Sequence, residues 1–181
     1  MGDRSKDVTT ASTATLPATA ARALDFDALY RETRDDVYAY AATLLRHDAG
    51  AEDVTAQAFE RAYRKRNRYD ARRGTPRAWL FGIARNAALD ELRRRKRAAT
   101  AEMPPPEVEP DPEERAELAL QREAVRLALG RLGARDREVI ALKYHGGLSN
   151  AELAAVLGVS ATNAGTLLHR AMTKLRESLD A

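Results

Sequence analysis

The chain has 181 residues, of which 30 are Lys or Arg and 27 are Asp or Glu, so its formal net charge is +3. It contains no cysteine, which excludes a disulfide framework and any zinc site built on thiolates. No apolar run approaches the ~20 residues that span a bilayer, and the N-terminus has no apolar signal core. We therefore expect a soluble, cytoplasmic protein with no membrane segment.

Charge is distributed unevenly along the chain. Residues 60–97 carry fourteen basic and four acidic side chains, a net charge of +10, whereas residues 98–117 carry one basic and seven acidic side chains, a net charge of −6. A concentrated basic stretch is typical of a surface that binds a polyanion, and a neighbouring acidic stretch can shield that surface or imitate nucleic acid. The alternative is a basic face that is merely solvated.

The N-terminal half begins with a segment of low apolar content. Residues 1–23 are rich in Thr, Ala and Ser, which predicts a disordered tail. From Phe26 to Leu44 apolar residues recur at three- and four-residue steps, which predicts a first helix, and Gly50 is expected to break this pattern. A second helix is predicted at about residues 51–66.

A loop and a third helix complete this half. Residues 68–76 include Gly74 and Pro76, and Thr75 is placed to cap a helix that has Pro76 at its first position. The helix that follows extends to about residue 97. It begins with the apolar letters WLFGI and ends with the basic letters RRRKR. Such a helix can pack against a core at its start and bind a polyanion at its end.

The second half is also helical. Residues 98–115 contain five of the seven prolines among mostly acidic neighbours, which predicts a flexible linker. Four further helices are expected, at about 118–132, 136–144, 149–157 and 161–178. The sequence shows no strand pattern. The predicted fold is therefore all-α, with two small helical domains at 24–97 and 116–181 joined by the proline-rich acidic linker.

The last two predicted helices have the pattern of a helix-turn-helix. Ser149 and Glu152 form a capping box, Gly158 suits the tight turn, and Ser160 caps the second helix. Short polar side chains and cations on one face of that helix can reach base edges and phosphates. The alternative is an ordinary helical hairpin. The side chains predicted to contact duplex DNA are Ser160, Thr162, Asn163, Thr166, His169, Arg170 and Lys174.

Residue patterns for catalysis are lacking. The three histidines are scattered without metal-ligand spacing, and neither a Ser/His/Asp set nor a glycine-rich phosphate loop is evident. We therefore expect a protein that is not an enzyme and needs no metal or cofactor.

Three stretches and the acidic linker between them resemble, in their order and spacing, an extracytoplasmic-function (ECF) sigma factor of bacterial RNA polymerase. The stretches are AEDVTAQAFERAYR (51–64), WLFGIARNAALDELRRRKR (79–97) and LGARDREVIALKYHGGLSNAELAAVLGVS (132–160). The resemblance covers about residues 24 to 180.

This resemblance implies a division of work between the two domains. The N-terminal domain, region two, is expected to bind the clamp helices of the polymerase largest subunit and to melt and read the minus-ten promoter element as single-stranded DNA. The C-terminal domain, region four, is expected to read the minus-thirty-five element as duplex and to contact the flap of the second-largest subunit. An anti-sigma factor is a further expected partner.

The resemblance also assigns residues. Those expected to bind polymerase are Glu52, Asp53 and Gln57, although the helix dipole alone can favour acidic residues in a first helical turn. Those expected to bind minus-ten DNA are Arg77, Trp79, Arg85, Asn86, Asp90, Arg93 and Arg94. Asn86, Asp90 and Arg93 share one helical face and can line a pocket for an extruded base, whose wall is the 68–76 loop. For Trp79 the sequence favours a core position over a stacking platform, because a lone Trp at a helix start usually packs in a core.

Two functions remain open at this point. The first is a promoter-specificity subunit that acts with RNA polymerase to initiate transcription of a specific regulon. The alternative is a helix-turn-helix transcriptional regulator whose N-terminal helices sense a ligand or dimerise.

Overall fold

A computed structural model of the protein describes residues 24–98 and 116–180. Within these ranges it contains seven α-helices, two short 3-10 turns and no β-strand, so the predicted all-α fold is confirmed. The prediction of a disordered tail at 1–23 lies outside the described residues, and so does that of a flexible linker at 98–115 except for Ala98, which is the last residue of the third long helix. In the described part of the chain no single helix is long and apolar enough to cross a membrane; α6 and α7 reach the length and composition only together, across a bend of 97°.

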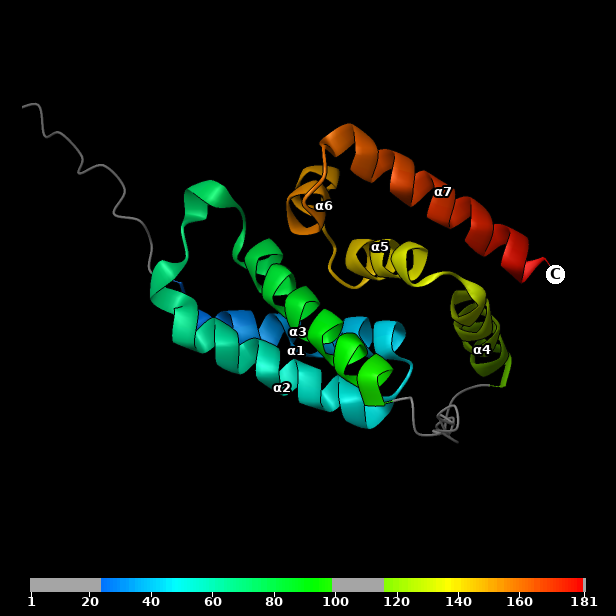
Figure 1. The fold of residues 1–181 in the computed structure, drawn as a ribbon, viewed down its shortest axis with the longest axis horizontal. Helices are drawn as coiled ribbons and strands as arrows, with labels where there is room; N and C mark the ends of the chain where they lie inside the picture. The colour runs from blue at the N-terminus through cyan, green and yellow to red at the C-terminus, as the bar shows by residue number, and fades with distance from the viewer. Residues whose placement is uncertain (1–23, 99–115, 181) are drawn as a thin grey trace, which may run out of the picture.

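The first three helices pack as a bundle (Figure 1). Their bounds are α1 Phe26–Leu45, α2 Asp48–Lys65 and α3 Pro76–Ala98. Apolar residues at helical spacing fill the space between them, including Val37, Val54 and Leu80, which are fully buried. The rings of Tyr40 and Phe81 meet edge to face at 5.8 Å between centroids. The apolar start of α3 therefore fixes this helix in the bundle.

The start of α2 differs from the prediction. The helix begins at Asp48, and Gly50 lies inside its first turn instead of breaking the helix. The N–H of Gly50 donates to Nδ1 of His47, which caps the helix at 3.0 Å. A side chain at position 50 would collide with the guanidinium of Arg95. Glycine therefore leaves room here for the flexible end of Arg95, and α1 ends earlier, at Leu45, with Arg46 as its C-cap residue in a left-handed conformation with φ of 54°.

Between α2 and α3 the chain forms the predicted loop. It contains two 3-10 turns, at Arg66–Arg68 and Ala71–Arg73. The N–H of Ala78 donates to Oγ1 of Thr75 at 3.2 Å, so the predicted cap of α3 is confirmed.

The second half contains the remaining four helices. Their bounds are α4 Ala116–Arg131, α5 Ala134–Tyr144, α6 Asn150–Leu157 and α7 Ala161–Leu179. The capping box of Ser149 and Glu152 is present, Gly158 ends α6 with φ of 70°, and Ser160 caps α7. These local features of the predicted helix-turn-helix are confirmed. Ala171 and Leu175 on α7 form a small buried cluster with residues of α4 and α5.

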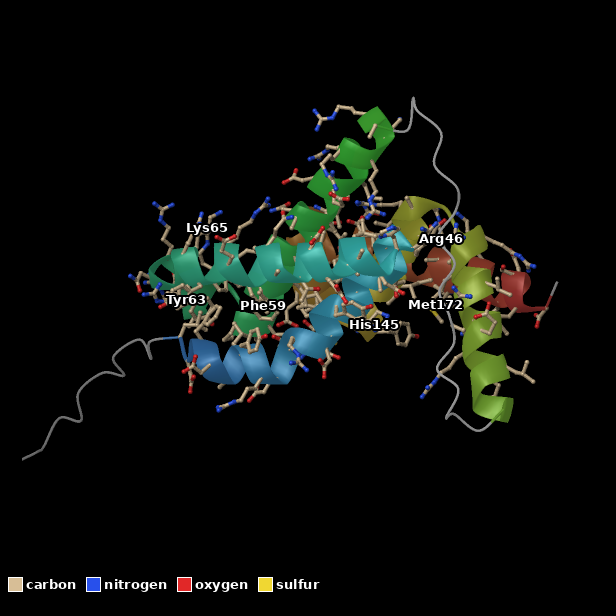
Figure 2. The ribbon with its side chains drawn as sticks, turned by 90° about the horizontal axis from the view of Figure 1, so that it is seen from below. Arg46, Phe59, Tyr63, Lys65, His145 and Met172 are labelled. Carbon is tan, nitrogen blue, oxygen red and sulfur yellow. The ribbon has the colours of Figure 1, made fainter. Side chains whose placement is uncertain are left out.

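The two halves pack against each other. α5 lies on α1 and α6 lies on α3, and one continuous buried cluster contains residues from both halves. Figure 2 shows His145, the residue that follows α5, at this contact, where its Nε2 lies 3.0 Å from Oγ1 of Thr43 on α1. Burial in the contact lowers the pKa of His145 below its ordinary value. The predicted domains therefore share one core in this structure.

Candidate nucleic-acid interface

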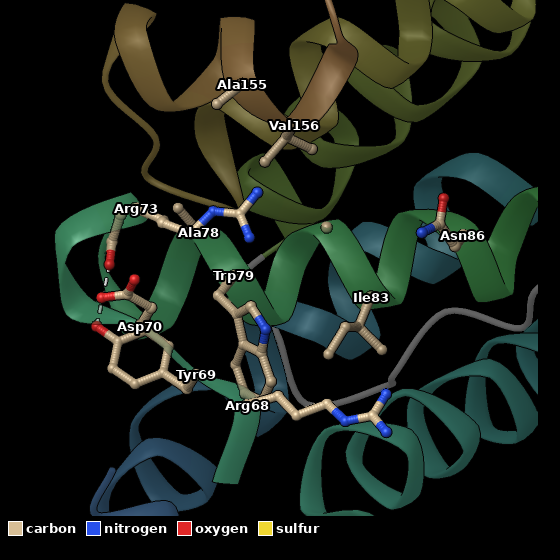
Figure 3. Close-up of a pocket in the computed structure, with 12 residues that line it drawn as sticks. Arg68, Tyr69, Asp70, Arg73, Ala78, Trp79, Ile83, Asn86, Ala155 and Val156 are labelled. Carbon is tan, nitrogen blue, oxygen red and sulfur yellow. Dashed lines mark hydrogen bonds between the residues drawn. The ribbon is translucent and has the colours of Figure 1, made fainter. Parts of the chain in front are cut away.

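An open pocket of about 520 Å³ lies between the 68–74 loop and the first turns of α3 (Figure 3). Its third wall is α6, which belongs to the second half of the chain. The residues that line it include Arg68, Tyr69, Asp70, Arg73, Trp79, Ile83, Asn86, Ala155 and Val156.

The pocket offers the groups that an unstacked base requires. The rings of Trp79 and Tyr69 lie 5.6 Å apart at a tilt of 59°, and Trp79 is half-buried, so it contributes both to packing and to the lining. The hydroxyl of Tyr69 donates to the carbonyl oxygen of Gly74 at 3.0 Å, which fixes the loop. The side-chain hydrogen bond from Arg72 lowers the pKa of Asp70 below its ordinary value. Aromatic faces, an amide and nearby cations suit a base and its phosphate.

The structure separates three residues that the sequence placed in one pocket. Asn86 is exposed and lines the pocket, whereas Asp90 and Arg93 are not among the lining residues. The carboxylate of Asp90 instead accepts hydrogen bonds from Arg93 at 3.0 Å and from Arg61 at 3.3 Å. The helical face they share continues away from the pocket along α3. A role of Asp90 and Arg93 in DNA binding stays a prediction.

Two of the predicted DNA-binding arginines face the second half of the chain. The Arg77 guanidinium donates to the carboxylate of Asp36 at 2.5 Å and to the carbonyl oxygens of His145 and Gly146, at 2.8 and 2.5 Å. Nε of Arg85 lies 2.8 Å from Oε1 of Glu138 on α5. In this arrangement the guanidinium groups of both arginines are bound by other groups of the protein. Their predicted contacts with DNA require the halves to be arranged differently.

The basic end of α3 is organised around one buried carboxylate. Glu91 accepts two hydrogen bonds from Arg94, at 2.7 and 2.8 Å, and one from Arg95, at 2.6 Å. These hydrogen bonds, those of Arg94 first, lower the pKa of Glu91. Arg95 also reaches Nδ1 of His47, at 3.4 Å, and so fastens the end of α3 to the start of α2. Arg94 remains 69% exposed and available to a DNA backbone.

The residues predicted to bind polymerase lie on the outer surface of α2. Glu52, Asp53 and Gln57 are all exposed. Beside them is a shallow groove of about 300 Å³ between α1 and α2, whose lining includes Tyr30 and Phe59. Figure 2 labels Phe59 and, further along α2, Tyr63. Tyr30 and Tyr63 are exposed there, and exposed aromatic residues of this kind suit a protein partner.

The predicted duplex-reading residues lie on one solvent-facing side of α7. All seven are exposed. Ser160 Oγ accepts the N–H of Asn163 as a helix cap, and Lys174 forms an ion pair with Asp136 at 2.5 Å. The opposite side of α7 packs through Ala164 and Ala171. The helix therefore presents polar groups outward, as a recognition helix requires.

Sequence reasoning missed the residues that the second half contributes to this interface. Ala155 and Val156 of α6 line the pocket, and Glu138 of α5 pairs with Arg85. A signal for Glu138 exists, because this carboxylate shares the buried side of α5 with Leu142, and a buried charge needs a partner. Ala155 and Val156 carry no signal of that kind.

Comparison with known proteins identifies the family. Sigma-70 region 2 matches residues 29–98, and Sigma-70, region 4 matches residues 122–175. The ECF RNA polymerase sigma factor SigL of Mycobacterium tuberculosis is 35% identical over 166 residues, which cover 90% of this chain and 93% of SigL. The chain belongs to the ECF family of RNA polymerase sigma factors. BldN of Streptomyces coelicolor, another such sigma factor, is also 35% identical, over 90% of this sigma factor and 63% of BldN.

Solved structures agree with this assignment. The sigma factor RpoE in complex with the anti-sigma factor NepR from Bartonella quintana matches with a TM-score of 0.73 at 25% identity, over 87% of this sigma factor and 98% of RpoE. CnrH in complex with the cytosolic domain of CnrY matches with a TM-score of 0.64 at 28% identity, over 86% and 87% of the two chains. The alternative of a regulator with a sensing domain is not favoured, because the N-terminal helices match sigma region two.

Proposed function

We propose that this sigma factor binds the core of RNA polymerase, reads a promoter through two separate sites and initiates transcription of a specific regulon in the cytoplasm. It supplies specificity and strand capture and catalyses no reaction itself. The observation that carries this proposal is the pocket beside Trp79 and Asn86, which lies on the same helix as a cluster of arginines.

In the proposed minus-ten site a base leaves the stack and enters the pocket. Unstacking costs a few kcal/mol, whereas stacking on an aromatic side chain contributes about 1–3 kcal/mol per base. Tyr69 and Trp79 offer aromatic surface, Asn86 offers both a hydrogen-bond donor and an acceptor, and Arg93 and Arg94 can hold the backbone. The exposed cations at the end of α3 add favourable free energy of binding through contacts with the phosphates.

The other two contacts are proposed for the outer faces of α2 and α7. Glu52, Asp53 and Gln57 would bind the clamp helices of the largest polymerase subunit. The exposed side of α7 would enter the major groove of the minus-thirty-five duplex, while region four also contacts the flap of the second-largest subunit. An anti-sigma factor is a further proposed partner, since RpoE and CnrH, which resemble this sigma factor, were solved with an anti-sigma factor and with the cytosolic domain of CnrY.

The minus-ten site is tested by run-off transcription with purified polymerase core on a genomic promoter pool, followed by Asn86→Ala. We expect transcripts from a small set of promoters that depend on this sigma factor. Asn86→Ala should reduce transcription from duplex templates by about tenfold or more, because it removes a base contact that is worth about 1–3 kcal/mol. A pre-melted template should recover most of that loss if base capture drives opening. Equal losses on both templates would remove Asn86 from strand opening.

The polymerase site is tested by Asp53→Arg, measured as binding to core by fluorescence anisotropy. Asp53 is exposed, so the fold should be kept, whereas reversal of a charge in a docked interface should weaken binding by well over tenfold. Glu60→Arg is the matched control, because Glu60 is an exposed acid of the same helix that pairs with Arg64 within α2. Equal core affinity for Asp53→Arg and wild type would disprove the assignment.

A further inference from the structure

Asp90 links α3 to α2, which packs beside it (Figure 1). Its Oδ1 accepts a hydrogen bond at 3.0 Å from Nη1 of Arg93, which lies three residues further along α3. Its Oδ2 accepts one at 3.3 Å from Nη1 of Arg61 on α2. Each oxygen of this carboxylate therefore holds one guanidinium group, and we call Arg61, Asp90 and Arg93 the α2–α3 arginine cluster.

The two guanidinium groups of the cluster keep donors that can bind an anion. Arg93 donates to Asp90 through Nη1, whereas Arg61 donates through Nη1 to Asp90 and through Nη2 to Oε1 of Gln57, at 3.4 Å. A guanidinium group has five N–H donors in a planar fork, so further donors remain on each arginine. Both side chains are also accessible, since Arg61 is 38% and Arg93 is 68% exposed. The cluster can therefore bind a phosphate oxygen without releasing Asp90.

The cluster lies where a strand would run after it leaves the pocket. Asn86 lines the pocket, and Asp90 and Arg93 follow it at steps of four and three residues, on the same side of α3. Because an α-helix rises by about 1.5 Å per residue, Asp90 lies about 6 Å further along the helix than Asn86. A strand that continues along α3 from the pocket would bring a phosphate to the cluster.

The carboxylate of Asp90 makes this grouping of cations possible. Two guanidinium groups repel each other at close range, and a carboxylate that accepts from both offsets the repulsion and fixes their side chains. Two positive charges and one negative charge leave the cluster with a net charge of +1, so it still attracts an anion. A carboxylate alone would instead repel a phosphate.

From this geometry we propose that Arg61 is a further DNA-binding residue, which holds a phosphate of the minus-ten strand together with Arg93. Asp90 is then a positioning residue for both arginines and not a reader of a base. The inference rests on the function proposed above, because it assumes that the strand enters the pocket and continues along α3. It gives α2 a contact with DNA in addition to its proposed contact with polymerase.

Asp90→Ala tests the positioning role through the sign of its effect. The probe is a fluorescent promoter template with a single-stranded minus-ten region, from a promoter that the transcription assay selects, and it is bound by holoenzyme formed at saturating core. If Asp90 contributed only its charge, its removal would strengthen binding to a polyanion. We expect Asp90→Ala to weaken binding by about fivefold instead, because the two arginines lose the group that holds them. Affinity equal to or above that of wild type would overturn the proposal.

Glu60→Ala is the matched control. Glu60 is also an exposed acid in an ion pair with an arginine, but its partner, Arg64, lies four residues along the same helix. The variant changes the net charge as Asp90→Ala does, and its affinity for the template should equal or slightly exceed that of wild type. Thermal unfolding followed by circular dichroism checks that each variant folds, which we expect because exposed ion pairs contribute little to stability. An equal loss of affinity in Glu60→Ala and Asp90→Ala would contradict the role of the cluster.

Arg61→Ala tests the phosphate contact from α2. We expect its affinity for the template to be about fivefold lower at about 0.1 M salt, and the plot of log affinity against log salt concentration to be shallower by about 0.7, the value for one phosphate of a single strand. The loss should be the same for every base placed in the minus-ten element, because a phosphate contact does not read sequence. Arg64→Ala, which removes an exposed arginine of the same helix, should keep the wild-type slope. An unchanged slope for Arg61→Ala would exclude Arg61 from the DNA contact.

The double variant Arg61→Ala with Asp90→Ala tests whether the two residues act together. Because Asp90 is proposed to act through the arginines, the loss of affinity in the double variant should be clearly smaller than the product of the two single losses. Losses that multiply would show that Asp90 acts independently of Arg61. A loss for Asp90→Ala that appears with only one base of the element would make Asp90 a base reader and would also refute the proposal.

Failure of the proposed function gives a different result. In that case wild-type holoenzyme neither binds the template nor supports transcription from the promoter. Normal binding and transcription by wild type, together with unchanged affinity in Asp90→Ala and Arg61→Ala, would leave the proposed function in place and refute only the arginine cluster.

Discussion

The arginines of the basic stretch have different surroundings. Arg77 and Arg85 face the second half of the chain, Arg95 reaches across to the start of α2, and Arg94 is largely exposed. Residues 60–97 read as one block of net charge +10 in the sequence. The structure divides that block into cations that are largely buried in contacts within the fold and cations such as Arg94, which also binds Glu91 but remains exposed to solvent.

Glu91→Gln tests what these contacts contribute to stability. The hydrogen bonds from Arg94 and Arg95 hold the folded-state pKa of Glu91 below its ordinary value of 4.5. The stability that the carboxylate contributes is therefore fully present above about pH 4.5 and is lost as the pH falls through the lower, folded-state pKa. We expect Glu91→Gln to lower the free energy of unfolding by about 1–2 kcal/mol at pH 7, because charge-assisted hydrogen bonds are lost.

Urea unfolding at pH 7, 5 and 4 measures the effect. The difference between Glu91→Gln and wild type should be constant at the two higher pH values and should shrink at the lowest. Glu123→Gln, which removes a more exposed pair of the same kind, should change stability by less than about 0.5 kcal/mol. A difference for Glu91→Gln that does not vary with pH would show that its charge is not the cause.

At the scale of single residues, the sequence predicts the chemical role and exposure of a side chain better than it predicts which residue that side chain contacts. Exposure was correctly expected for the polar side of α7, because helical periodicity places those residues opposite Ala164 and Ala171. The sequence did not predict that Asp90 would pair with Arg61 of α2, because a contact between two helices has no local signature.

The helices themselves were predictable where their ends carry local signals. The helix-turn-helix was located from its capping box and from Gly158, and both are present in the structure. The start of α2 was mispredicted, because Gly50 breaks a helix in isolation but here makes room for Arg95. Local propensity gives way where another helix needs the space.

Gly165 offers a test at the scale of one helix. It lies inside α7 without a positive φ, and a Cβ added there would meet nothing within 4 Å. Gly165→Ala should therefore stabilise the protein by about 0.5–1 kcal/mol, through better helix propensity and a less flexible unfolded chain, and raise the melting temperature by about 1–4 °C.

Gly158→Ala is the contrasting variant, measured by the same thermal unfolding. Position 158 has φ of 70° at the end of α6, so a side chain there should cost about 1 kcal/mol even though the space around it is open. If Gly165→Ala melts no higher than wild type, glycine at this position has a structural role that the packing around it does not explain.

The contact between the two halves is a property of the whole molecule and was not predicted. Periodicity showed that α5 and α6 each have an apolar side, but not that these sides would meet α1 and α3. A proline-rich linker favoured two independent domains, and the shared buried cluster shows how closely they associate. Sequence pattern identifies surfaces to be buried, whereas their pairing depends on shape.

Trp79 reports on this contact, because it is the single tryptophan in the sequence and lines the pocket that α6 covers. Acrylamide should quench its fluorescence more strongly in Glu138→Gln than in wild type, since loss of the charge that pairs with Arg85 weakens the contact and separation of the halves uncovers the ring. Glu123→Gln should match wild type, and the urea-unfolded chain gives the upper limit. Equal quenching in all three folded proteins would mean that the pocket is no more accessible in Glu138→Gln.

One carboxylate serves both its own helix and the contact between the halves. Oε2 of Glu152 accepts hydrogen bonds from the backbone N–H and the hydroxyl of Ser149, whereas Oε1 accepts one from the hydroxyl of Thr75. Thr75 in turn keeps the first turn of α3 in order through its own oxygen. The hydrogen bonds that cap α6 and α3 are therefore made within each half, so both helix ends would keep them if region four moved away from region two to meet the duplex.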